Sequence, residues 1–115
     1  MLSLTPENVV AAYSLLCTTP PFNRWHLPPA DEIEFHIQRT RKQFADCEII
    51  NGTPIIRVSA AKHAQLGTLL ATVAHEIIHL YEFRRLPAKE VRHGASFNKL
   101  ADRVCKIHGF DRGAF

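Results

Sequence analysis

The chain has 115 residues, of which 46% are hydrophobic and 22% charged, a composition typical of a soluble globular protein with room for one domain. The formal net charge is +3 and the sequence pI is about 9.0, a mild basic excess that permits contact with nucleic acid without requiring it. The three cysteines are scattered and form no C-x-x-C pair, which excludes a disulfide framework and a four-cysteine zinc ribbon.

The N-terminal segment TPENVVAAYSLLC predicts an amphipathic helix. Thr5 is suited to the N-cap and Pro6 to the first turn, and apolar residues then recur at helical spacing. No basic residues precede the apolar ones, so the segment is not a signal peptide, and no apolar run approaches the roughly 18 residues of a membrane span. We therefore expect a cytoplasmic protein, of a bacterium or of a host cell if a phage encodes it.

The middle of the chain, after a proline-rich connector, predicts a sheet of about three strands. Residues 32–39, EIEFHIQR, alternate between apolar and polar side chains, as a half-buried strand does. Two further apolar runs, QFADCEII and TPIIRVSA, are separated by Asn51 and Gly52, a strong hairpin signal. Pro54 lies near the start of the last run, so we expect residues 54–59 to form an edge strand.

Two helices are predicted in the last part of the chain. Residues 64–84 form the longest element, and their apolar side chains surround most of the helix, which predicts a central position. A charged loop containing Pro87 follows, and then ASFNKLADRVCKIHG predicts a C-terminal helix with Gly109 as its cap. The expected fold is α+β: an N-terminal helix, a small sheet, a central helix and a C-terminal helix, in a single domain over residues 1–115.

The central helix contains an H-E-x-x-H motif, formed by His75, Glu76 and His79. Residues four apart lie one turn apart with Cβ atoms about 5–6 Å from each other, so the two imidazoles can reach one cation. Glu76 is rotated by about 100° from His75, so we expect it to flank the cation as a base and not to ligate it. The alternative is that both histidines are hydrogen-bonded core residues.

A catalytic zinc ion takes three protein ligands and leaves one position for water. His93 is the strongest candidate for the third ligand, because the loop around Pro87 lets the chain turn back and a helix follows. Gly94 after it permits an unusual backbone angle or a close approach. Rival third ligands are His26, His36, His63, Glu90, Asp102 and His108.

Two segments are rich in basic residues: Arg39, Arg41 and Lys42, and then Arg84, Arg85, Lys89 and Arg92. They would form either a basic rim that attracts DNA to the site or ordinary solvated ends of loops and strands. The second interpretation is favoured, because the net charge is small and no aromatic residues interleave with the basic ones. Trp25, close to Phe22, is expected to close the core and not to stack on bases.

The stretches LLATVAHEIIHLYEF and RHGASFNKLADRV resemble the SprT-like metallopeptidases, the group that includes the Spartan proteases. That family carries H-E-x-x-H on its central helix and an H-G-x-x-F element whose histidine is the third zinc ligand. The matching residues here are His93, Gly94 and Phe97. The resemblance covers roughly residues 30–110 and is to a minimal form without the C-terminal zinc ribbon. It implies a zincin-like fold, one catalytic zinc ion on His75, His79 and His93, and a connection to repair of DNA–protein crosslinks.

The function predicted is a zinc-dependent peptidase in which Glu76 is the general base on zinc-bound water. Residues 54–59 would pair with an extended protein substrate, and Tyr81 and Arg92 are candidates for oxyanion or substrate contacts.

Two other functions are compatible with the sequence. One is a DNA- or protein-binding module, stabilised by metal or metal-free; the other is a zinc hydrolase acting on something other than a peptide. Glu76 argues against the module, because a structural zinc ion gains nothing from a base beside it. A fourth ligand, from Glu82 or Glu90, would favour the module.

Overall fold

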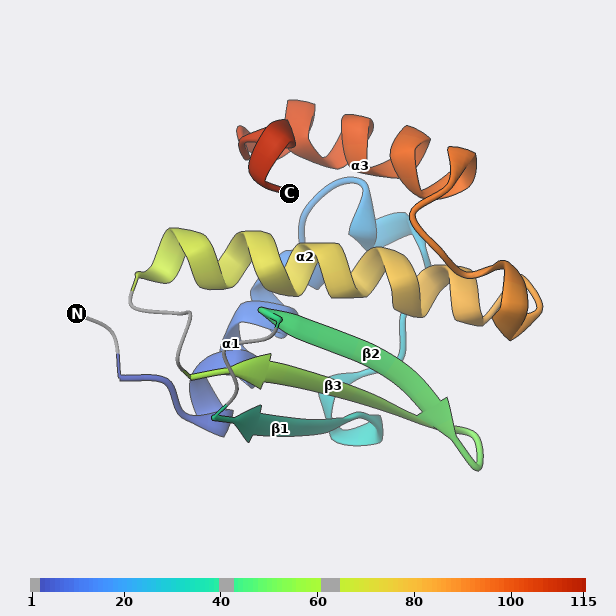
Figure 1. Cartoon of the computed structure of the whole chain (residues 1–115). Coiled ribbons are helices and arrows are strands. Elements are labelled where there is room, and N and C mark those ends of the chain that lie inside the picture. The colour runs from blue at the N-terminus through green and yellow to red at the C-terminus, as the bar shows by residue number, and fades with distance from the viewer. Residues whose placement is uncertain (1–2, 40–42, 61–64) are drawn as a thin grey trace.

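A computed structural model describes residues 3–39, 43–60 and 65–115 and, within them, places three α-helices with a three-stranded sheet (Figure 1). The elements in chain order are α1 (Pro6–Cys17), β1 (Glu34–Gln38), β2 (Ala45–Ile50), β3 (Thr53–Ser59), α2 (Leu66–Phe83) and α3 (Ala95–His108). The expected α+β class is confirmed, and each element lies within a few residues of its predicted place. No helix among the described residues is long and apolar enough to cross a membrane.

Helix α1 begins where the sequence predicts. The Thr5 hydroxyl accepts a hydrogen bond from the Asn8 backbone N–H at 3.2 Å, and the Asn8 side chain accepts one from the Thr5 N–H at 3.1 Å. This reciprocal capping box satisfies two backbone donors that the first helical turn leaves without partners. The helix then buries one face, formed by Val9, Ala12, Tyr13 and Leu16.

The sheet has the strand order β1-β3-β2, with β1 parallel and β2 antiparallel to β3. The hairpin between β2 and β3 turns at Asn51 and Gly52, as predicted. Their φ angles are 50° and 81°, and a type I′ turn requires positive φ at both positions. Asparagine and glycine adopt such angles most readily, which explains why this pair forms the turn.

The prediction that residues 54–59 form an edge strand is wrong, because β3 is the central strand. Pro54 is tolerated there because of its position. It pairs with Ile49 of β2, one step beyond the Ile50–Thr53 pair that closes the turn, so alternation points its nitrogen away from β2. On that other side, β1 begins only at Glu34, opposite Ile55. The missing N–H of Pro54 therefore costs the sheet no hydrogen bond.

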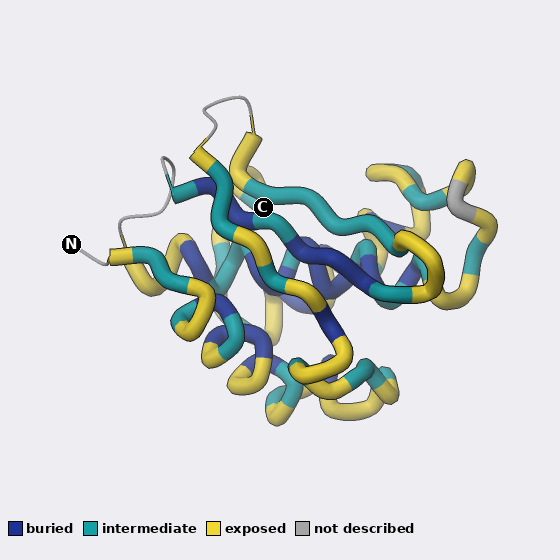
Figure 2. Tube along the Cα trace, turned by 90° about the horizontal axis from the view of Figure 1, so that it is seen from below, coloured by how far each residue is buried: buried dark blue, intermediate teal, exposed yellow. Residues whose placement is uncertain are grey.

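The helices lie in layers on one side of the sheet. Figure 1 shows α1 and α2 against the sheet and α3 on the opposite side of α2. Seen from the sheet side in Figure 2, β3 is the most buried strand between more exposed neighbours. The most deeply buried side chains of the single core cluster come from all three layers: Val9, Ile56, Val58, Leu69, Val73, Ile77, Ile78, Leu80 and Val104. Helix α2 is therefore central, as its apolar circumference predicts.

Candidate metal centre

Helix α2 directs His75 and His79 toward His93 and α3, and it directs Glu76 toward Asp46 and Cys47 of β2. His75 and His79 are half-buried, and Glu76 is buried with 4% of its surface exposed. The rest of the helix is fixed by apolar side chains on its other faces, such as Val73, Ile77 and Leu80. A helix held this firmly gives its polar side chains defined positions, as a binding site requires.

His93 lies in the connection between α2 and α3, one residue before the Gly94 N-cap of α3. The Phe97 ring lies 4.6 Å from the His93 ring centroid, 4.7 Å from that of His79 and 4.8 Å from that of His75. The Phe97 ring thus packs against all three imidazoles. The expectation of an unusual angle at Gly94 is wrong: its φ is −99°, and an added Cβ would meet only the Arg92 side chain, at 3.4 Å.

The three imidazoles converge through their Nε2 atoms. His93 Nε2 lies 3.1 Å from His75 Nε2 and 2.9 Å from His79 Nε2. These are the predicted ligands, and they form a group that could hold a metal ion among the described residues. Nitrogens bound at 2.0–2.1 Å in tetrahedral zinc geometry lie roughly 3.3 Å apart, close to these separations. A single proton on His93 Nε2 cannot serve both neighbouring nitrogens equally, whereas one cation can serve all three.

The environment keeps His75 and His79 neutral, which is the form of histidine that binds metal. Burial, followed by the neighbouring imidazoles, lowers the pKa of His79 to about 4. Burial also lowers the pKa of His75 to about 4, although the hydrogen bond to Phe115 acts in the opposite direction. Both rings therefore carry a free nitrogen lone pair at neutral pH.

The backbone oxygen of Phe115 is a site contact that the sequence motifs did not reveal. It accepts a hydrogen bond from His75 Nδ1 at 2.7 Å. A proton on Nδ1 leaves Nε2 unprotonated and directed at the cluster, so this contact fixes the tautomer that a metal needs. The Phe115 ring also lies 5.3 Å from the His75 ring. A backbone contact across 40 residues leaves no pattern in the sequence that could have predicted it.

The environment of Glu76 raises the proton affinity of its carboxyl. Burial, and secondarily the charge of Asp46, raises the pKa of the Glu76 carboxyl to about 8. Its Oε1 atom is buried and has no hydrogen-bond partner among the described residues. A cation beside this carboxyl would favour its ionised form and lower that pKa.

This raised pKa predicts a pH-dependent cost in stability when a chelator is present. The unfolded Glu76 titrates near 4.5 and the folded one near 8, so folded protein holds the extra proton between these values. The contribution of Glu76 to stability therefore falls as pH rises from about 4.5 to about 8. Relative to Glu76→Gln, which cannot titrate, we expect the wild-type protein to lose roughly 2–4 kcal/mol over this window in urea unfolding. The exposed control Glu32→Gln should follow the wild type, and parallel curves for wild type and Glu76→Gln would contradict the prediction.

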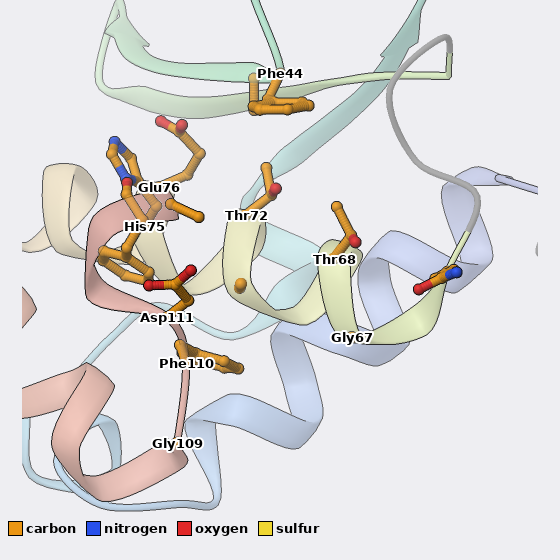
Figure 3. A pocket seen from close by; sticks show the side chains of 14 residues that line it. Phe44, Gly67, Thr68, Thr72, His75, Glu76, Gly109, Phe110 and Asp111 are labelled. Carbon is orange, nitrogen blue, oxygen red and sulfur yellow. The ribbon is translucent and has the colours of Figure 1, made fainter.

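A pocket of about 730 Å³ opens beside these residues (Figure 3). His75 and Glu76 lie at one end and Gly67 at the other, with Phe44 above and Phe110 below. Its lining is mostly apolar, and the described residues contribute no lysine or arginine to it. The site therefore combines a convergent histidine cluster, a buried carboxyl and an adjoining cavity large enough for substrate side chains.

The described contacts of the two predicted substrate residues do not include the three histidines. Tyr81 stacks on Trp25 with ring centroids 4.3 Å apart, and its hydroxyl accepts a hydrogen bond from Arg85. Arg92 is exposed and has no hydrogen bond or ion pair to any described residue. Trp25, which also contacts Phe22, closes the core as predicted.

The rival third ligands have other positions. His108 hydrogen-bonds to Thr19 and Pro20, His36 contacts Glu34, and Asp102 accepts from Arg112. His26 and Glu90 are exposed and outside the cluster. His63 lies outside the described residues, as do Arg41 and Lys42 of the predicted basic rim. In the second basic segment, Arg84 donates to the His26 carbonyl, and Lys89 is exposed.

Comparison of the chain with protein-family models gives no match, and comparison with curated proteins gives no significant match.

Proposed function

We propose that the chain is a zinc-dependent metallopeptidase with a zincin-like fold, of the SprT-like type that its motifs resemble. The observation that carries the proposal is the convergence of His75, His79 and His93 beside Glu76 at the end of a pocket; Glu76 is buried and has no hydrogen-bond partner in the described part of the chain. These are the donor set and the base that a hydrolytic zinc site needs. The extension to DNA-associated proteins comes from the resemblance alone.

Each residue then has a defined task. His75, His79 and His93 would hold the zinc ion, which when bound acidifies water and polarises a carbonyl group. Glu76 accepts the proton of the attacking water and passes it to the departing amine. Because burial strengthens the carboxyl as a base, Glu76 suits both halves of this transfer. Phe115 keeps His75 in the tautomer that presents Nε2 to the cluster.

Strand β2 replaces β3 as the edge that would receive substrate. Among the described residues, β2 has β3 as its single neighbour, and its first residue, Ala45, lines the pocket together with Glu76. Antiparallel alternation from the Ile50–Thr53 pair directs the backbone groups of Ala45, Cys47 and Ile49 toward the free edge. An extended peptide pairing there would place alternate side chains toward the apolar pocket.

The ligand set favours a hydrolase over a metal-stabilised binding module. Among the described residues the cluster contains three histidines and no carboxylate, so it would offer a cation an open position. Glu90 is exposed in the short turn Ala88–Glu90, and Glu82 approaches the Nδ1 side of His79, away from the converging Nε2 atoms. Neither therefore acts as the closing ligand that a structural site would require.

Metal removal tests the proposal. Purified protein loaded with zinc should cleave a loosely folded protein such as casein, lose this activity after chelator treatment and dialysis, and recover it when zinc is returned. A parallel set with single-stranded DNA and with double-stranded DNA shows whether DNA changes the rate. Cleavage that persists after verified removal of the metal, or its absence with and without DNA in fully loaded protein, contradicts the proposal.

A further inference from the structure

A second buried carboxyl lies one turn beyond the motif. The Glu82 side chain has 3% of its surface exposed, and its Oε1 atom has no hydrogen-bond partner among the described residues. An unpartnered carboxyl at this depth is costly, so its presence calls for a partner that a small movement can supply.

That partner is on the neighbouring histidine. His79 Nδ1 is also buried and also lacks a hydrogen-bond partner among the described residues. It lies 4.0 Å from Glu82 Oε1. A hydrogen bond between these groups needs about 2.7–3.2 Å, so a side-chain adjustment on the order of 1 Å satisfies both atoms together.

The two nitrogens of His79 therefore face different groups. Nε2 lies 2.9 Å from His93 Nε2, in the cluster, while Nδ1 faces Glu82. His75 is arranged in the same way, with Nε2 toward His93 and Nδ1 bonded to the Phe115 oxygen. Both helix ligands thus have an acceptor behind the ring, one from the backbone and one from a side chain.

We propose that Glu82 is a positioning residue that accepts the Nδ1–H of His79 and thereby directs its Nε2 lone pair at the metal site. The inference rests on the metal site of the proposed function, but it does not depend on peptide hydrolysis. Acceptors of this kind fix the tautomer and ring orientation of metal-ligating histidines and raise their basicity. Without Glu82, His79 would divide its population between two tautomers, and one of them cannot bind metal through Nε2.

Two variants of the whole chain separate this role from general packing. In Glu82→Leu the acceptor is lost, and we expect the zinc dissociation constant, measured by chelator competition, to rise about 10- to 100-fold. In Glu82→Gln the amide oxygen can still accept the Nδ1–H, so most of the affinity should remain. Glu90→Gln, which changes an exposed carboxylate closer in sequence to His93, is the matched control and should bind zinc as the wild type does.

Nitrogen-15 NMR of the imidazoles in zinc-free wild-type protein supplies a readout that needs neither metal nor folded variants. We expect His79 in the Nδ1–H tautomer, with that proton protected from exchange. A predominant Nε2–H tautomer overturns the inference, as does equal zinc affinity of wild type and Glu82→Leu. Protein with the Nδ1–H tautomer that binds zinc but cleaves nothing would refute the peptidase and leave the role of Glu82 supported.

Discussion

Replacing Glu76 by glutamine is expected to lower peptide hydrolysis by about 100- to 10,000-fold while leaving zinc bound. Glutamine keeps nearly the same shape but cannot accept and return a proton, so the proton transfers lose their base. None of the three converging nitrogens belongs to Glu76, so the ligand set is unchanged. The measurements are zinc content by mass spectrometry of the metal and initial rates of casein cleavage under saturating zinc.

The effect should be specific to this carboxyl. Glu32→Gln changes an exposed side chain in the short turn Ala30–Glu32 and should keep both zinc and activity. If Glu76→Gln cleaves as fast as the wild type, the mechanism is wrong even though the site binds metal. If it loses zinc as well, Glu76 stabilises the bound metal, and its assignment as a base outside the ligand set must be withdrawn.

Local signals in the sequence were sufficient for most of the fold. Thr5 and Asn8 mark the start of α1, Asn51 and Gly52 fix a type I′ hairpin, and Gly109 ends α3 with a φ of 78°. Each of these features depends on a few adjacent residues, and their chemistry leaves few backbone alternatives.

The order of strands required information that is not local. Pro54 excludes a central position only if its nitrogen would face a neighbouring strand. Whether it does so depends on where β1 begins opposite β3. The parallel pairing of β1 with β3 joins segments separated by β2 and the hairpin turn, so no short pattern specifies it. The consequence is functional, because it transfers the proposed substrate edge from β3 to β2.

The candidate site, like the fold, is predictable from the sequence only in part. The spacing of His75 and His79 on one helix predicts their shared face, and His93 converges with them as expected. The oxygen atoms that face Nδ1 of His75 and Nδ1 of His79 follow from no sequence motif. Glu82, a candidate fourth ligand by sequence, instead faces His79 Nδ1. The backbone oxygen of Phe115, 40 residues further along the chain, accepts the hydrogen bond of His75.

Replacing His93 by alanine is expected to weaken zinc binding by more than about 100-fold. Loss of a hydrogen-bond acceptor behind a ligand costs up to roughly 100-fold, and this substitution removes a proposed ligand itself. Two histidines on one helix would remain, and a site with two protein ligands holds zinc poorly. The measurements are zinc affinity by chelator competition and the zinc-induced rise in melting temperature. That rise reports binding to the folded state and should disappear in the variant at zinc concentrations that saturate the wild type.

His108→Ala is the control for this substitution, since it removes a histidine that bonds to Thr19 and Pro20 away from the cluster. Its melting temperature without zinc should fall because those contacts are lost, but the added zinc should raise it as in the wild type. The opposite pattern, with zinc stabilising His93→Ala fully and His108→Ala not at all, would place the metal elsewhere. It would also leave the 2.9 Å and 3.1 Å approaches of His93 as ordinary hydrogen bonds between imidazoles.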